Sequence, residues 1–323
     1  MSSNETIFIT GGAGFIGTNL SLLFLKKGYK VIVYDSFLRN AQKYFSDLTD
    51  HKNFRVIDGD VRNLGQLKEC VKGADYVFHL AAIAGVSKYS RIPVDVLEVN
   101  VIGTYNILEA IKDEKSVKGF FDFSTSEIYG SNCFSAKEDG DVKMENLSEK
   151  RWTYATSKIA SEKFGMSYFW QYEVPFIGIR PFNVYGPGQV GEGVLSYFIN
   201  RALSGKELTV TGDGSQCRTF CYIDDFIHGI DILMNNIEKA VGDSFNIGCS
   251  DEIISMYSLA KKVVEIHGQP LDISFVEHSG EDVLCRAPSI SKIKNLGYRP
   301  KVTLSEGVRK CYEWYRKYQV ELD

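Results

Sequence analysis

The chain has 323 residues, of which 44% are hydrophobic, and its 37 basic and 41 acidic residues give a formal net charge of −4. A chain of this length can bury a large core and suggests about two domains. Basic and acidic residues are interspersed without a long like-charged run, which argues against a nucleic-acid or membrane surface, so we expect neither partner.

Six short runs rich in β-branched and aromatic residues predict strands: "TIFIT", "KVIVYD", "FRVIDGD", "DYVFHLAA", "GFFDFST" and "PFIGIRPFN". Segments between them predict helices over residues 15–27, 64–72, 93–113 and 153–172. Strands that alternate with helices are typical of parallel strands joined by right-handed crossovers. We therefore expect an α/β fold with a doubly wound parallel sheet, whose binding sites form at the carboxyl ends of the strands.

The pattern changes after Asn183, where glycine-rich turns such as "YGPGQVGEGV" and "TGDGSQ" separate shorter elements. Helices are expected over residues 193–204, 224–237, 255–267 and 303–319. We predict one domain over residues 1–182 and a smaller mixed α/β lobe over residues 183–323. The segment "DSFNIG" has the composition of a strand, so the chain is expected to return to the main sheet within residues 220–248.

A glycine-rich turn follows the first expected strand. "ITGGAGFIGTNL" places Gly11, Gly14 and Gly17 where that strand gives way to a helix. Glycine allows a tight turn and a close approach to a pyrophosphate, and the helix N-terminus offers N–H groups and a positive dipole. Asp35 ends the second strand, about 20 residues on, where its carboxylate can accept from the ribose hydroxyls of adenosine. The spacing predicts a Rossmann-type dinucleotide site.

The identity of the dinucleotide depends on the charges near its adenosine. The carboxylate of Asp35 would repel the 2′-phosphate of NADP, so the sequence favours NAD. Arg39 is near enough in sequence to offer that phosphate a partner, which keeps NADP as the alternative. In "GDVR", Asp60 and Val61 are expected to contact the adenine.

"RWTYATSKIASE" places Tyr154 and Lys158 four residues apart on one face of the helix expected over 153–172. An ammonium group and an oxidised nicotinamide would lower the phenol pKa, ordinarily about 10, by favouring the phenolate. A phenolate can take a hydroxyl proton while hydride leaves the same carbon. Such a pair alone is common on solvated helix faces. Its support here is Thr125, which follows the carboxyl end of the "GFFDF" strand and precedes Ser126 and Glu127.

Motifs spread over nearly the whole chain resemble, in order, those of the extended short-chain dehydrogenase/reductases that remodel nucleotide sugars. They are "ITGGAGFIG", "HLAA", "EVNVIGTYNILEA", "STSEIYG", "YATSK", "IRPFNVYGPG", "GDGSQCRTFCYIDD", "FNIG" and "RAPSI". The resemblance implies an enzyme with NAD as cofactor and a nucleotide sugar, with a UDP-sugar favoured, as substrate. The second lobe would then bind that substrate.

The same resemblance implies roles for individual residues. Thr125, Tyr154 and Lys158 would form the oxidising triad, with Lys158 also holding the nicotinamide ribose. Substrate contacts are expected at Asn183, Val194, Arg218 and Arg286, the two arginines clamping the diphosphate, a task that suits a guanidinium. Catalysis is expected at Thr125, Ser126, Glu127, Tyr154 and Lys158. Cofactor contacts are expected at Gly11, Gly14, Phe15, Ile16, Gly17, Asp35, Asp60, Val61, Ala81, Ala82, Ser124, Tyr154, Lys158 and Pro181.

Oxidation at C4 of the sugar gives a 4-keto intermediate from which three reactions can follow. Return of hydride to the other face makes a 4-epimerase, loss of the C6 hydroxyl makes a 4,6-dehydratase, and loss of a C6 carboxylate makes a decarboxylase. Thr125-Ser126-Glu127 resembles the UDP-glucuronate decarboxylases, and "RWTYATSK" is close to a form found among them. Some GDP-sugar 4,6-dehydratases share Thr-Ser-Glu, whereas epimerases generally lack the glutamate. We therefore favour decarboxylation, with dehydration and epimerisation as alternatives.

One departure from the family pattern concerns substrate charge. Many decarboxylases and dehydratases read Gly-Pro-Arg where this chain has Gly186, Pro187 and Gly188, so a cation is missing there. Glu127 is expected to act as the base at C5 in a dehydratase, or to steer the departing carboxylate in a decarboxylase. A non-catalytic dinucleotide-binding module is an alternative of a different class, and the complete triad argues against it.

Cysteine usage and apolar helix positions give the remaining expectations. The seven cysteines are odd in number and form no CxxC pair, which predicts reduced thiols in a cytoplasmic protein and no metal site. Met166, Phe169 and Trp170 add apolar surface to the helix expected over 153–172, where relatives dimerise, so we expect a homodimer.

Overall fold

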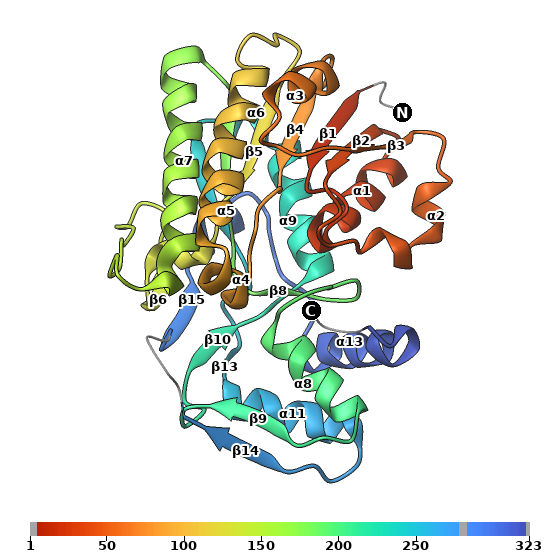
Figure 1. Ribbon diagram of the computed structural model, residues 1–323, viewed down its shortest axis with the longest axis vertical. Helices are drawn as coiled ribbons and strands as arrows, with labels where there is room; N and C mark the ends of the chain where they lie inside the picture. Colours follow the sequence, from red (N-terminus) through yellow and green to blue (C-terminus); the bar gives the residue numbers. More distant parts are fainter. Residues whose placement is uncertain (1–4, 278–282, 321–323) are drawn as a thin grey trace.

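The computed structural model of the protein describes residues 5–277 and 283–320. Within these residues, a seven-stranded parallel sheet has the order β12-β7-β5-β4-β1-β2-β3. Its strands are β1 (Thr6–Thr10), β2 (Lys30–Asp35), β3 (Phe54–Asp58), β4 (Tyr76–His79), β5 (Gly119–Phe123), β7 (Phe176–Pro181) and β12 (Asp243–Ile247). The strand order reverses beside β1, and Figure 1 shows helices on both sides, so the expected doubly wound α/β fold is confirmed.

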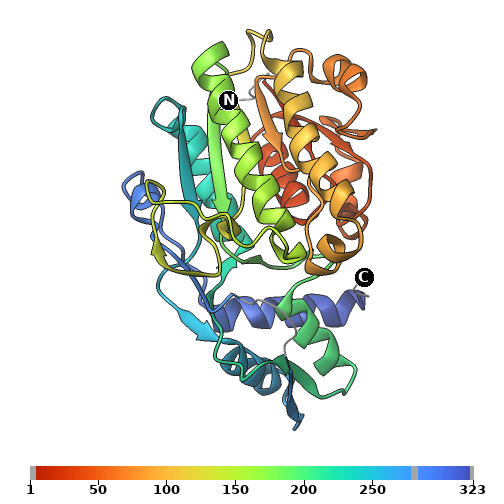
Figure 2. The ribbon, with the colours of Figure 1, turned by 60° about the vertical axis from the view of Figure 1, so that its left-hand side comes forward.

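Helices cover both faces of the large sheet because its strands are apolar on both sides. One face packs against α3 (Leu64–Val71), α6 (Gly103–Ile111) and α7 (Thr153–Tyr172), through a core that includes Phe120 and Phe176. The opposite face packs against α1 (Phe15–Lys26) and α9 (Ile223–Asn235), and this larger core continues into the second lobe. Helices α6 and α7 run side by side across the sheet (Figure 2).

The helix expected over residues 93–113 is instead three segments. These are α5 (Pro93–Leu97), a π-helical turn (Glu98–Ile102) and α6. The turn places Asn100 in the interior, where its Oδ1 accepts from the Ile83 N–H at 2.8 Å and its Nδ2 donates to the Ser157 hydroxyl at 3.0 Å. A π turn of this kind re-aims one side chain, here tying the loop after β4 to α7.

The second half of the chain builds most of a smaller lobe below the sheet (Figure 1). Its principal helices are α8 (Val194–Leu203), α11 (Met256–His267) and α13 (Leu304–Tyr318). Ser255 caps the N-terminus of α11 and Thr303 that of α13, and their hydroxyls accept N–H groups of the first turn at 3.1 and 3.3 Å. Between these elements, β12 pairs in parallel with β7, so the chain re-enters the large sheet.

Three small sheets and several short helices complete the described structure. The four-stranded sheet has the order β13 (Ile253–Ser255), β10 (Cys217–Thr219), β15 (Cys285–Pro288) and β6 (Asn132–Ala136). The two-stranded sheets pair β8 (Val184–Tyr185) with β11 (Cys221–Tyr222), and β9 (Leu208–Thr211) with β14 (Ile273–Val276). The short helices are α2 (Ser46–Thr49), α4 (Val86–Arg91), α10 (Ile237–Ala240), α12 (Ser291–Lys294) and the 3-10 turns η1 (Gln42–Tyr44), η3 (Ser126–Tyr129) and η4 (Lys150–Trp152). Among the described helices, none is long and apolar enough to span a bilayer.

Candidate active site

The glycine-rich turn connects β1 to α1 and packs tightly against the chain after β4. Gly11 has a φ of +70°, and a Cβ atom there would lie 2.6 Å from the Ala81 nitrogen. A Cβ atom at Gly17 would lie 2.5 Å from the Gly12 Cα. Gly11 therefore requires glycine for conformation and for space, and Gly17 for space alone. By contrast, a Cβ atom at Gly14 would have only the Gly11 oxygen nearby, at 3.3 Å.

A cavity of about 870 Å³ extends from this turn to α7. Every residue expected to contact the dinucleotide lines it: Gly11, Gly14, Phe15, Ile16, Gly17, Asp35, Asp60, Val61, Ala81, Ala82, Ser124, Tyr154, Lys158 and Pro181. The cavity thus joins the start of α1, with its exposed N–H groups, to the Tyr154–Lys158 pair. The glycine cradle and the length of this cavity fit a dinucleotide, with its pyrophosphate at the helix N-terminus.

Asp35 and Arg39, the two charged residues that bear on the choice between NAD and NADP, have different surroundings. Asp35 ends β2, and its carboxylate accepts from the Ala13 N–H at 2.8 Å and the Phe37 N–H at 2.7 Å. Burial raises the pKa of Asp35 even though these hydrogen bonds favour the ionised form. Arg39 reaches across the cavity mouth, where its Nη2 donates to the Ala84 carbonyl at 2.9 Å. The side chain of Asp60 is bound by Arg62, with Nη2 and Oδ2 2.6 Å apart.

A second cavity of about 600 Å³ adjoins the first on the side of the small lobe. Its lining includes Glu127, Asn183 and Val194, and Tyr154 lines both cavities. Asn183 has a φ of +40°, which asparagine tolerates, and its Nδ2 donates to the Thr219 carbonyl at 2.8 Å. Glu192 also lines both cavities and accepts hydrogen bonds from the hydroxyl and the N–H of Ser87. Tyr154 therefore stands where a dinucleotide and a second ligand would meet.

The three residues of the expected triad come together from two elements. Thr125 precedes η3 directly after β5, and Tyr154 and Lys158 lie on the first turns of α7. The Thr125 Oγ1 accepts from the Glu127 N–H at 3.2 Å, and the Thr125 hydroxyl also hydrogen-bonds the Tyr154 phenol. Lys158 is almost fully buried and lines only the dinucleotide cavity of the two.

Burial and charge act together on the pKa of Tyr154. Burial and the negative charge of Glu127 raise this pKa in the protein alone, although its hydrogen bond with Thr125 acts in the other direction. Burial also lowers the pKa of Lys158. The expectation that the ammonium and an oxidised nicotinamide together lower the phenol pKa stays a prediction for the protein with its dinucleotide bound.

Glu127 is surrounded by arginines. The Arg151 guanidinium binds both of its carboxylate oxygens, at 2.7 and 3.2 Å, and Arg286 Nη1 lies 3.5 Å from Oε1. Burial would raise the pKa of Glu127, but Arg286, Arg151 and Arg218 together lower it below its ordinary value. Glu127 is therefore an ionised carboxylate at neutral pH. Ser126, its neighbour, is buried.

The two arginines expected at a diphosphate lie on adjacent strands. Arg218 on β10 and Arg286 on β15 are paired in register, and neither lines the second cavity. Arg286 is only 4% exposed, and among the described residues its Nε and Nη2 have no hydrogen-bond partner. The structure thus brings Arg286 to Glu127.

Two residues at the site were missed by the sequence reasoning. Arg151 lies on η4, directly before α7, and "RW" before the Tyr-x-x-x-Lys pair was the available signal. Tyr89 on α4 stacks on Tyr154, with ring centroids 5.3 Å apart, and its hydroxyl accepts from the Gly85 N–H at 3.1 Å. Nothing in the local sequence "VSKYSR" indicated this contact.

A comparison with protein families finds that residues 7–248 match the model of the "NAD dependent epimerase/dehydratase family". The chain belongs to this family. It is therefore an NAD-dependent enzyme of the group that comprises nucleotide-sugar epimerases, dehydratases and decarboxylases, and the resemblance stated from the motifs is confirmed.

Three known proteins show how similar this family member is to others. It is 34% identical to the UDP-N-acetyl-alpha-D-glucosaminuronate decarboxylase of Bacillus cytotoxicus, over 96% of this chain and 97% of the relative. It is 33% identical to UDP-glucuronic acid decarboxylase 1 of Xenopus tropicalis, over 97% of this chain and 72% of the relative. The solved structure of UDP-glucuronic acid 4-epimerase from Bacillus cereus, in complex with UDP-glucuronic acid and NAD, superposes with a TM-score of 0.90. That likeness covers 97% of this chain and 99% of the other at 30% identity.

Proposed function

We propose that this family member is a decarboxylase of a nucleotide hexuronate, with UDP-glucuronate or its 2-acetamido relative as substrate. The observation that carries the proposal is the arginine cluster around Glu127, next to Tyr154. Arg286 contacts Glu127, which lines the second cavity, and Arg286 keeps two buried N–H positions without a described partner. A buried guanidinium with unused donors favours an anionic ligand, and a carboxylate matches its planar fork.

The arginines also offer an answer to the missing cation at Gly188. That glycine has a φ of +90°, and a Cβ atom there would lie 3.0 Å from the Phe45 ring, so a larger residue would be strained and would press on that ring. Positive charge near the sugar comes instead from Arg151 on η4 and Arg286 on β15. These elements approach Glu127 from two sides, which suits recognition of a carboxylate at C6.

The chemistry assigned to the chain's own residues begins at Tyr154. Its phenolate takes the proton of the C4 hydroxyl, and Thr125 donates a hydrogen bond to the phenolate oxygen. Bound NAD supplies the hydride acceptor in this step and the hydride donor in the last one. Lys158 faces the same cavity, where its ammonium would hold the nicotinamide ribose.

The 4-keto sugar is a β-keto acid, and its C5–C6 bond then breaks. Carbon dioxide departs, and the electron pair of that bond passes through C5 to the C4 oxygen as an enolate. A proton returned to C5 restores the ketone, and reduction at C4 restores the hydroxyl. Ser126 and the Arg151–Glu127 pair would steer the departing carboxylate, with the hydrogen bonds to it coming from the Ser126 hydroxyl and the guanidinium. Tyr154 would return its proton to the C4 oxygen.

The charge state of Glu127 weighs against dehydration. A 4,6-dehydratase needs a base strong enough to remove the C5 proton and an acid for the C6 hydroxyl. Arginines lower the pKa of Glu127, which makes it a weaker base, and Ser126 is a poor acid. Loss of carbon dioxide needs no proton removal from C5, so it suits an ionised Glu127 better.

Epimerisation at C4 of the same hexuronate is the second candidate. It is favoured by the likeness to the Bacillus cereus UDP-glucuronic acid 4-epimerase. An epimerase and a decarboxylase would share the substrate and the first oxidation. They would differ in whether the C5–C6 bond of the 4-keto intermediate breaks.

The deciding experiment incubates the purified protein with NAD and, separately, UDP-glucuronate, UDP-N-acetylglucosaminuronate, UDP-N-acetylglucosamine, dTDP-glucose and GDP-mannose. Mass spectrometry of the products separates loss of carbon dioxide from loss of water and from unchanged mass with a new sugar epimer. The proposal expects carbon dioxide loss from a hexuronate alone. Water loss from a neutral hexose, or an epimer without mass change, would overturn it. Glu127→Gln should still bind NAD but form no product.

A further inference from the structure

Asp122 is a buried carboxylate at the centre of the large sheet that the reaction above does not use. It lies on β5, three residues before Thr125, and none of its surface is exposed. Its side chain points to the face covered by α6 and α7, as does that of Phe120 two residues earlier. Among the described residues, neither carboxylate oxygen has a hydrogen-bond partner. Buried carboxylates are rarely left in this state.

The neighbouring strands supply no donor to Asp122. On β4 its register partner is His79, whose Nδ1 and Nε2 are engaged by the hydroxyls of Thr10 at 2.7 Å and Thr104 at 3.0 Å. Burial, with Lys158 nearby, lowers the pKa of His79 to about 3, so the ring is neutral. On β7 the register partner is Gly178, where a Cβ atom would lie 2.3 Å from the Ser244 hydroxyl.

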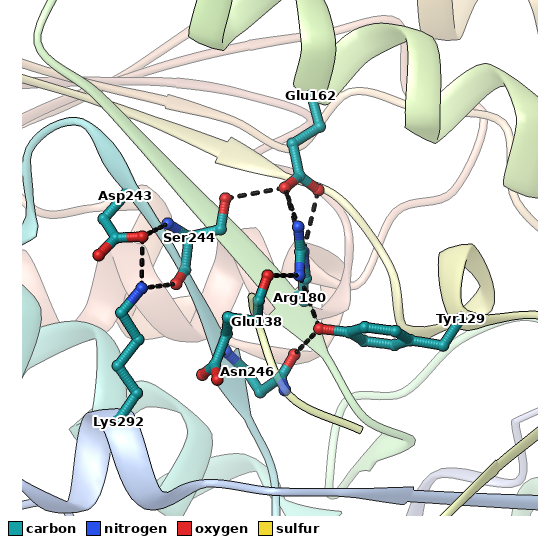
Figure 3. Close-up of polar contacts among 8 residues, drawn as sticks. All are labelled: Tyr129, Glu138, Glu162, Arg180, Asp243, Ser244, Asn246 and Lys292. Atoms are coloured by element: carbon teal, nitrogen blue, oxygen red, sulfur yellow. Dashed lines mark hydrogen bonds and ion pairs between the residues drawn. The ribbon is translucent and has the colours of Figure 1, made fainter. Parts of the chain in front are cut away.

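Helix α7 brings two charged residues over Asp122, and only one of them is fully engaged elsewhere. Glu162 accepts from Arg180 Nη2 at 2.6 Å, from Arg180 Nε at 3.1 Å and from the Ser244 hydroxyl at 2.8 Å. Figure 3 shows this arrangement, in which Arg180 also donates to the Tyr129 hydroxyl. Arg180 thereby balances the charge of Glu162. Lys158 lies one turn earlier on α7. The negative charges of Asp122 and Glu162 favour its ammonium form.

We propose that Asp122 is a positioning residue for Lys158, and that the charge of its carboxyl group sets how strongly the Lys158 ammonium favours the phenolate of Tyr154. The inference rests on the roles proposed above for Tyr154 and Lys158. When Asp122 is ionised, its negative charge holds the ammonium and opposes the phenolate. When it is protonated, the field of the ammonium at Tyr154 is unopposed.

The ionisation of Asp122 falls within the working pH range of an enzyme. Burial raises its pKa to about 7, with Lys158 acting to lower it and Glu162 to raise it. The negative charge of Asp122 is in turn among the causes that raise the pKa of Tyr154. The other groups that face Asp122 are neutral His79 from β4 and Gly178 from β7. As the pH rises through 7, ionisation of Asp122 therefore resists deprotonation of Tyr154, which broadens the pH range over which the phenol exchanges its proton.

The test compares the wild type with Asp122→Asn and Asp122→Leu, each saturated with NAD. An ultraviolet difference titration against the Tyr154→Phe form of each protein reports the pKa of Tyr154. Removal of a unit charge at an effective dielectric constant of about 20 should lower this pKa by at least about one unit in both variants, since a separation of about 10 Å already gives such a shift. Asp75→Asn, which removes a carboxylate at the start of β4 that is ion-paired with Lys118, is the matched control and should leave it unchanged.

A second measurement observes Asp122 directly and does not depend on the variants folding. The carboxyl carbon of Asp122, followed by nuclear magnetic resonance, should titrate near neutral pH in the wild type and at a higher pH in Lys158→Met. A wild-type titration at the ordinary value for aspartate would overturn the proposal. An unchanged pKa of Tyr154 would also overturn it, provided that circular dichroism shows the variant measured, Asp122→Asn or Asp122→Leu, to be folded.

These measurements need no sugar nucleotide, so their failure is distinct from failure of the proposed function. If no hexuronate is turned over, the decarboxylase assignment falls while the titrations still decide the role of Asp122. If turnover is found, the acidic limb of the rate profile should move by about one pH unit to lower pH in Asp122→Asn. An unmoved limb would count against Asp122 alone.

Discussion

The ring of Tyr154 stacks on the ring of Tyr89, with centroids 5.3 Å apart and planes 6° from parallel. Tyr89 is buried, and its hydroxyl accepts from the Gly85 N–H, so the ring is held from the loop after β4. The phenol of Tyr154 is thus oriented by the stacked Tyr89 ring on one side and by the Thr125 hydroxyl at its oxygen.

Loss of the stacking contact between Tyr89 and Tyr154 should slow the chemical step. An aromatic contact of this kind contributes about 1 kcal/mol beyond its buried area, so Tyr89→Leu should lower kcat by roughly fivefold. Binding of NAD, measured by calorimetry, should change little. Tyr89→Phe keeps the ring and should stay within about twofold of the wild type. Equal losses in Tyr89→Phe and Tyr89→Leu would show that the hydroxyl, rather than the stack, matters.

Arg151 should control the pH at which Glu127 loses its charge. The folded-state pKa of Glu127 lies below its unfolded value, so its ionised contacts stabilise the protein above the unfolded value and are lost as the pH falls through the folded one. Arg151→Met removes one of the groups that lower this pKa, so the titration of the Glu127 carboxyl carbon, followed by nuclear magnetic resonance, should move to higher pH. Arg151→Lys keeps the charge and should move it less. Identical titrations for both variants would contradict the assignment.

Asp122 should make the protein less stable as the pH rises. Its folded-state pKa is about 7, above an unfolded value of about 4, so the folded state binds more protons than the unfolded state between these values. The free energy of unfolding therefore falls as the pH rises from 4 to 7 on account of this group. Urea melts at pH 5 and pH 8 should show Asp122→Asn gaining stability over the wild type at pH 8. A constant difference at both pH values would refute this.

Gly11 should be essential for dinucleotide binding because it packs closely against the chain after β4. A second glycine with a similar φ but open space around it, Gly73, serves as the control for backbone strain alone. Gly11→Ala places a Cβ atom 2.6 Å from the Ala81 nitrogen and should weaken NAD binding by more than about tenfold. Gly73 has a similar φ of +73° but nothing within 4 Å of its Cβ position. Gly73→Ala should therefore lower the melting temperature slightly and leave NAD affinity unchanged. Equal affinities for the two variants would contradict the packing argument.

A homodimer is predicted through the outer faces of α5, α6 and α7. Val94 and Trp170 are 65% and 63% exposed on these helices, and the exposed Tyr105 on α6 contacts Phe164 on α7. Light scattering should give twice the chain mass of 36.3 kDa, and Tyr105→Glu combined with Trp170→Glu should give the monomer. Leu147→Glu, at a position 77% exposed outside these helices, is the control and should leave the mass unchanged. A wild-type protein with the mass of a single chain would contradict the prediction.

The sheet order and the dinucleotide cavity could be predicted because their signals are local. Strand and helix periods alternate along the first 183 residues, and Gly11 and Gly17 in the turn have no space for a larger residue. Each expected cofactor contact lies next to such a motif, at a strand end or a helix start. Their position around one cavity then follows from the geometry of parallel strands.

The environment of Glu127 and Tyr154 could not be predicted because it is made by residues far apart in sequence. Arg286 reaches Glu127 from a strand of the small lobe, and Tyr89 reaches Tyr154 from a six-residue helix with no distinctive pattern. The effect of burial on the phenol likewise depends on packing that no motif records. For Asp122 a signal existed, since a carboxylate interrupts the otherwise apolar strand "GFFDF".

The return of the chain to β12 has a consequence for any attempt to divide the protein. A fragment ending at residue 182 would lack β12 and would leave β7 as the outermost strand, with unpaired backbone groups beside Phe176, Ile177 and Ile179. An apolar sheet edge of this kind invites aggregation. We therefore expect the nucleotide-binding half to fold poorly by itself, and shortened versions made for crystallography or engineering should keep the chain through residue 248.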